Sequence, residues 1–125
     1  MSDWNENGVT ALNRYFNTYQ KTQDSDSAIE KFNEEIVEQM ANDGIEIEHS
    51  WSHDLSIAQL TDLVSGVASQ VIEIKNKDSE NKESYDDIFG PLHTEISNAL
   101  SYAKDEKGDD AYENLYEIID QLYEN

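Results

Sequence analysis

Apolar residues recur at alternating steps of three and four along most of the chain, and this spacing constrains the fold more than any other feature. The clearest run contains Ile57, Leu60, Val64, Val67, Val71 and Ile74. Steps of three and four place side chains on one face of an α-helix, whereas a half-buried strand needs strict alternation. The run therefore predicts a central core helix.

Other stretches with the same spacing predict the remaining helices. We expect one over roughly residues 8–22 and a second that ends at Gly44, whose apolar face consists of Ile29, Phe32, Ile36, Val37 and Met40. The spacing resumes over 85–103 and again after Gly108, where Asp109 is a plausible cap and the inward residues are Ala111, Leu115, Ile118 and Leu122. Within 85–103, Gly90-Pro91 should kink the helix or begin a new one at Pro91.

Helix starts are predicted from capping boxes, in which a Ser precedes a Glu or Gln by three residues. Ser27 with Glu30 and Ser56 with Gln59 have this spacing. Residues 45–55 alternate only briefly, so they predict an ordered connection in which a short strand is possible, and polar residues 76–84 predict a loop or a fraying helix end. With 125 residues, we expect a single all-α domain, a helical bundle of four to five helices with or without one short extended segment.

The charge balance limits the partners of this chain. It has 28 acidic and 8 basic residues, for a net charge of -20, and the 43 residues from Phe32 to Ile74 contain nine carboxylates and no Lys or Arg. Such a field repels nucleic acid and anionic lipid and attracts basic proteins. We therefore expect no direct nucleic-acid binding and no membrane binding, and a basic DNA-binding protein or enzyme as the partner.

Two acidic stripes follow helix faces. One stripe has steps of four, three and four and consists of Glu113, Glu117, Asp120 and Glu124. The other repeats the helical spacing with Glu30, Glu34 and Glu38, and Lys31 is the only cation that compensates its charge. Like charges at this spacing cost a helix about 0.2–0.5 kcal/mol per pair. A single stripe is usually a solvated helix face, but two stripes beside the cation-free span favour a partner-binding surface. Its predicted residues are Glu30, Glu34, Glu35, Glu38, Asp43, Glu46, Glu48, Asp109, Asp110, Glu113, Glu117, Asp120 and Glu124.

The charge density of the chain is close to that of DNA. Duplex DNA carries twenty charges over roughly 34 Å of its axis, and a compact chain of this length is about 36 Å across. Carboxylates four residues apart on a helix are separated by about 6 Å, near the roughly 6.8 Å between alternate phosphates of one strand. A rigid acidic helix could therefore occupy a cationic groove that normally holds a duplex.

A resemblance to a known family points the same way. The segment Met40-Ala-Asn-Asp-Gly-Ile-Glu-Ile-Glu48 closes an acidic helix and is followed by more helix and an acidic, tyrosine-bearing terminus. In these features the chain resembles phage Ocr-type anti-restriction proteins, although it lacks their dense terminal run of carboxylates. The resemblance implies an all-helical, dimeric mimic of bent B-form DNA that occupies the DNA channel of type I restriction and modification enzymes. It assigns no catalytic residue.

The leading hypothesis is therefore a DNA-mimic inhibitor of a bacterial defence enzyme, acting in the cytoplasm of the host cell. An immunity-type protein that neutralises a basic nuclease toxin is the alternative, and an enzyme that uses paired carboxylates is the least favoured. No cofactor or metal is expected, since the chain has no cysteine and the His49 and His53 pair falls in a predicted loop. The resemblance implies a homodimer, but self-repulsion opposes one, so the oligomeric state stays open. Core packing and contact with a partner are equally good interpretations of the three tyrosines near the terminus, Tyr112, Tyr116 and Tyr123.

Overall fold

The computed structural model describes residues 3–77, 82–107 and 109–120, and they form an all-α domain, which confirms the predicted fold class. The helices are α1 (Trp4–Thr22), α2 (Ser25–Asn42), α3 (Trp51–Asp54), α4 (Ile57–Lys77), α5 (Lys82–Lys107) and α6 (Asp109–Asp120). Across these described ranges there is no strand, so the possible extended segment within 45–55 does not form one. Part of this segment forms the short helix α3 instead, so the described residues contain six helices where four to five were predicted.

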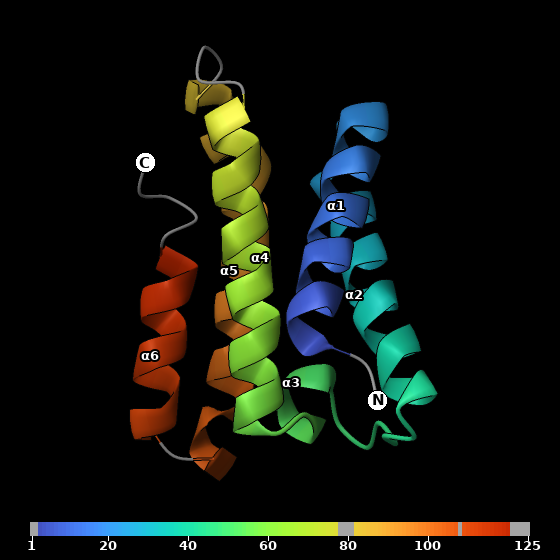
Figure 1. The fold of residues 1–125 in the computed structure, drawn as a ribbon, viewed down its shortest axis with the longest axis vertical. Helices are drawn as coiled ribbons and strands as arrows, with labels where there is room; N and C mark the ends of the chain where they lie inside the picture. The colour runs from blue at the N-terminus through green and yellow to red at the C-terminus, as the bar shows by residue number, and fades with distance from the viewer. Residues whose placement is uncertain (1–2, 78–81, 108, 121–125) are drawn as a thin grey trace.

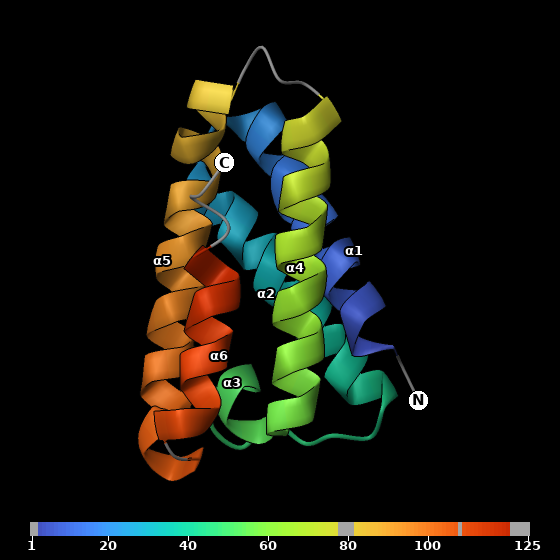
Figure 2. The ribbon, with the colours of Figure 1, turned by 60° about the vertical axis from the view of Figure 1, so that its left-hand side comes forward.

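The long helices run up and down in an antiparallel arrangement (Figure 1). Helices α1 and α2 form one pair, and α4 lies beside α1 with α5 behind it. Helix α6 packs on α4 and α5, on the side away from α1 and α2, as the view in Figure 2 also shows. The short helix α3 lies at the lower end of the bundle and contacts α5 and α2.

Helices α1 and α4 approach each other closely because each has a glycine at the crossing. A Cβ atom on Gly66 would lie 2.0 Å from the backbone oxygen of Asn5, and one on Gly8 would lie 2.2 Å from the backbone oxygen of Leu63. Real Cβ atoms do not approach backbone oxygens this closely, so glycine is needed on both helices. Both glycines are buried. The crossing therefore holds α4 tightly against α1, the partner of α2.

Most predicted helix faces are buried in the core, and several boundaries differ from the prediction. The capping box at Ser56 and Gln59 is confirmed, with reciprocal hydrogen bonds of 2.9 and 3.1 Å. The box at Ser27 is wrong, because Asp24 caps α2 by accepting from the Asp26 backbone N–H. Of the two alternatives predicted at Gly90-Pro91, a new helix that begins at Pro91 is wrong, since α5 continues through this residue.

A buried tyrosine joins α1 to α5. Tyr15 is fully buried, and its hydroxyl donates a hydrogen bond to the backbone oxygen of Ile88. Its ring packs near those of Tyr19 and Phe89. Burial raises the pKa of the Tyr15 hydroxyl well above its usual value. The folded state therefore holds this hydroxyl in its neutral form.

We expect this tyrosine to make the fold sensitive to alkali. Because the folded-state pKa of Tyr15 is raised, its contribution to stability is complete below the unfolded pKa of about 10. That contribution is lost above about pH 10 by roughly 1.4 kcal/mol per pH unit. Urea unfolding of Tyr15→Phe at several alkaline pH values should show a weaker loss than the parent chain shows. Tyr102→Phe, at a tyrosine that is 61% exposed, should keep the parent behaviour, and equal losses in all three proteins would contradict the assignment.

Candidate functional site

The acidic stripe on α2 is exposed, but cations partly compensate it. Glu30, Glu34 and Glu38 face solvent. Arg14 of α1 reaches Glu34 at 3.9 Å and Glu38 at 3.3 Å, and Lys31 lies 3.3 Å from Glu34. From the sequence, Lys31 was the only cation expected to compensate the charge of this stripe. The structure corrects this prediction, because Arg14 from the neighbouring helix also pairs with its carboxylates.

Glu35 does not belong to the predicted surface. Only 6% of the residue is exposed, and its carboxylate accepts from Arg14 at 2.9 Å and from the Gln39 side chain at 2.7 Å. The hydrogen bond from Arg14 to Glu35 is the largest of the effects that raise the pKa of the guanidinium. Glu35 therefore ties α2 to α1 and is a correction to the predicted set.

The stripe on α6 is the less compensated of the two. Glu113, Glu117 and Asp120 are exposed. Within the described part of the chain, Asp120 contacts the imidazole of His93 at 3.1 Å, and neither Glu113 nor Glu117 forms an ion pair. The fourth member of the stripe, Glu124, lies outside the described residues, and nothing is described of the side chains of Asp109 and Asp110, two further residues of the predicted surface. Of the two stripes, the one on α6 therefore carries more unpaired charge among the described residues.

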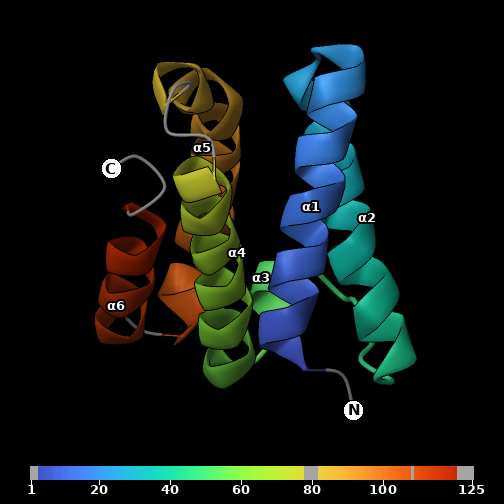
Figure 3. The ribbon, with the colours of Figure 1, turned by 45° about the horizontal axis from the view of Figure 1, so that its top comes forward.

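The helices that carry the two stripes, α2 and α6, lie on opposite sides of the bundle. Helix α6 covers the outer side of α4 and α5, whereas α2 packs on α1 at the other side (Figure 3). The prediction of one partner-binding surface therefore becomes two acidic flanks separated by the bundle. A partner that contacts both flanks must surround the molecule rather than touch one face.

A third group of carboxylates lies on the connection after α2. Glu46 and Glu48 are exposed and Asp43 is half-buried. The carboxylate of Asp54 holds this connection in place by accepting from the backbone N–H groups of Glu48 at 2.7 Å and His49 at 3.2 Å. Desolvation opposes ionisation of Asp54, but these two hydrogen bonds and the nearby histidines outweigh it and lower its pKa. Asp54 therefore stays ionised at neutral pH.

We expect Asp54→Ala to loosen this connection. Loss of the acceptor should speed hydrogen exchange at the Glu48 and His49 amides by about tenfold to a hundredfold, because hydrogen bonds to a charged group contribute roughly 1.5–3 kcal/mol. In the parent chain the same protection is lost as the pH falls through the lowered folded-state pKa of Asp54. Asp62→Ala removes an exposed carboxylate of α4 and should leave these amides unchanged. Equal exchange in the parent and in Asp54→Ala would contradict this role.

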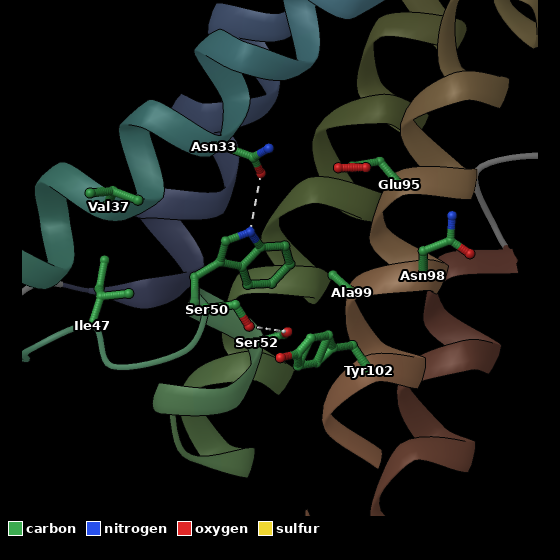
Figure 4. Close-up of a pocket in the computed structure, with 10 residues that line it drawn as sticks. Asn33, Val37, Ile47, Ser50, Ser52, Glu95, Asn98, Ala99 and Tyr102 are labelled. Carbon is green, nitrogen blue, oxygen red and sulfur yellow. Dashed lines mark hydrogen bonds between the residues drawn. The ribbon is translucent and has the colours of Figure 1, made fainter. Parts of the chain in front are cut away.

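A groove with an apolar lining lies between α2, α3 and α5. Its volume is about 440 Å³, and its apolar lining residues are Val37, Ile47, Trp51, Ala99 and Tyr102. Figure 4 shows Val37 and Ile47 on one side and the α5 residues Ala99 and Tyr102 on the other. The Trp51 indole N–H donates to the Asn33 side chain at 3.1 Å, which fixes the ring in the groove.

The groove collects the large apolar side chains that the fold leaves exposed. Among the described residues, the exposed large hydrophobic residues are Val37 at 41%, Ile47 at 40% and Tyr102 at 61%. All three line the groove. Sequence periodicity assigned Val37 to the inner face of α2, which is wrong. Neither Ile47 nor Tyr102 was a candidate site residue, because Ile47 lies in a segment that alternates only briefly and Tyr102 lies off the apolar spacing of its helix.

The described tyrosines of α6 and the His49 and His53 pair make contacts within the fold. Tyr112 is fully buried in the core, and the Tyr116 hydroxyl lies 2.6 Å from the Ser101 hydroxyl; Tyr123 lies outside the described residues. The rings of His49 and His53 meet edge to face with centroids 5.1 Å apart. In the described ranges no three His, Cys, Asp or Glu side chains gather in a way that could hold a metal ion.

None of the described helices combines the length and apolar character that a membrane crossing requires. Comparison with known proteins gave no match to a family model, to a curated protein or to a solved structure.

Proposed function

We propose that this chain is a DNA-mimic inhibitor that occupies the cationic DNA channel of a bacterial defence enzyme. The observation that carries the proposal is the pair of exposed acidic flanks on a helical bundle of net charge -20. A channel that encloses duplex DNA presents Lys and Arg to both strands, and so to opposite sides of its occupant. Two opposed acidic flanks match this arrangement better than a single acidic face does.

Helical order supports the same function. The carboxylates of α2 and α6 are carried on helices of the bundle, so the spacing of their backbone positions is set before binding and no backbone order must be gained. The Arg14 pairing with Glu34, Glu35 and Glu38 further fixes the α2 flank. By analogy with the Ocr-type resemblance, a type I restriction–modification complex is the first target to examine.

The salt dependence of binding to such a complex tests this proposal. Because the contacts are between exposed opposite charges, we expect the affinity to fall by about tenfold or more between roughly 50 and 200 mM salt. Binding that is indifferent to salt would contradict an electrostatic mimic. Ser69→Ala, at an exposed uncharged position of α4, serves as a control that should follow the parent curve.

An immunity-type protein is the second candidate, and the groove favours it. A protein that mimics DNA phosphates needs no apolar contact with its target. An inhibitor dedicated to one basic nuclease, in contrast, gains specificity from an apolar anchor. Binding to a single nuclease toxin with no competition from other DNA-binding enzymes would favour this candidate. Binding to several unrelated DNA-binding enzymes would favour the mimic.

A further inference from the structure

We propose that the groove between α2, α3 and α5 binds a basic segment of the partner protein through one large apolar side chain. The proposal deepens the function above, because it places a specific contact of the same cationic partner beside the acidic surface. The lining side chains Val37, Ile47 and Tyr102 are 40–61% exposed in the free chain. Burying them against one more apolar group removes this surface from water.

The groove has room for a large side chain. A cavity of about 150 Å³ holds benzene, so a groove of about 440 Å³ admits an aromatic or branched aliphatic side chain together with neighbouring atoms of its segment. The Trp51 ring, fixed by Asn33, forms a flat apolar wall. Tyr102 packs edge to face on His53 at 4.5 Å, so its ring is also held in position. A preformed groove of this kind binds at a small entropic cost.

The charge around the groove selects a basic occupant. Its walls come from residues 33–52 and 95–102, and neither stretch contains Lys or Arg. Glu95 lines it directly, and the exposed residues Glu46 and Glu48 flank Ile47 in the sequence. Apolar lining with an acidic rim is complementary to an apolar residue flanked by Lys or Arg.

The same charges disfavour a second copy of this chain in the groove. Two copies of net charge -20 would bring like charges together around a small apolar contact. Like-charge juxtaposition at an interface costs several kcal/mol. The occupant therefore belongs to a different, cationic protein.

Two synthetic peptides test this inference. Both are rich in Lys and Arg and carry the same charge, and they differ only in a central Phe or Ser. Calorimetry should show the Phe peptide binding about tenfold more tightly, the increment expected for burying one such side chain. The NMR resonance of the Trp51 indole N–H should shift with the Phe peptide and not with the Ser peptide.

Variants locate the effect at the groove. Val37→Ser with Ile47→Ser, and separately Tyr102→Ser, should remove the preference for Phe while retaining salt-dependent binding of both peptides. These side chains are exposed, so the fold is retained. Asn114→Ser, at an exposed position on α6, should keep the preference.

The outcomes separate this inference from the proposed function. Equal binding of the two peptides, no binding of either, or a preference that survives the groove variants overturns the groove inference and leaves the salt test on the restriction–modification complex to decide the mimic. Self-association that Tyr102→Ser abolishes would assign the groove to a second copy and also overturn it.

Discussion

Replacing Gly66 by alanine is expected to lower the free energy of unfolding by about 3 kcal/mol and the melting temperature by about 10 °C. The added Cβ would lie 2.0 Å from the Asn5 backbone oxygen, and backbone cannot move aside as a flexible side chain can. Helices α1 and α4 must therefore separate along their crossing. This loosens many buried contacts at once, since α1 packs extensively on α4.

Thermal and urea unfolding measure this effect directly. Ser69→Ala is the matched control, because it adds no new contact at an exposed position of the same helix and alanine favours the helix. We expect it to leave stability unchanged or slightly raised. A Gly66→Ala protein as stable as the parent would show that the close crossing of α1 and α4 is not present in solution.

Neutralising the α6 stripe is expected to have the largest effect on binding. The double variant Glu113→Gln with Glu117→Gln removes two exposed carboxylates that form no ion pair within the described residues. At about 1 kcal/mol for each exposed charge contact, affinity for the restriction–modification complex should fall by roughly 30-fold at low salt. The variant should also be more stable, since a like-charge pair four residues apart is removed. Weaker binding cannot then be attributed to unfolding.

The α2 flank provides the matched control for this prediction. Glu34→Gln with Glu38→Gln removes the same formal charge, but both carboxylates already pair with Arg14. We expect a smaller loss of affinity from this pair, measured by the same titration. A loss equal to that of the α6 variant would show that the local pairing does not set the strength of the acidic surface. No loss from either would contradict an acidic interface altogether.

Helices were predictable from the sequence because their spacing is a local property. The core run from Ile57 to Ile74 falls within α4, and the capping box at Ser56 is present. The start of α2 was misplaced because Asp24 and Ser27 are both good caps, and only the backbone conformation decides between them. Pro91 did not end its helix, because it lies inside a helix that packs on several neighbours along its length.

The site was less predictable, because its properties depend on which helices become neighbours. Glu35 is buried by a pairing with Arg14, 21 residues away in the chain, and no periodicity encodes this. Val37 has the spacing of a core residue, but no helix covers it, so it lines the groove instead. The two acidic stripes were alike in sequence, and only the topology places them on opposite flanks with different degrees of compensation.

Displacement of duplex DNA from a type I restriction–modification complex tests the central claim most directly. A labelled duplex is bound to the enzyme at low salt and titrated with the chain, and the titration is repeated at higher duplex concentrations. Binding in place of DNA predicts full release of the duplex, with the midpoint rising in proportion to the duplex concentration. A ternary complex that holds the duplex and the chain together would contradict it.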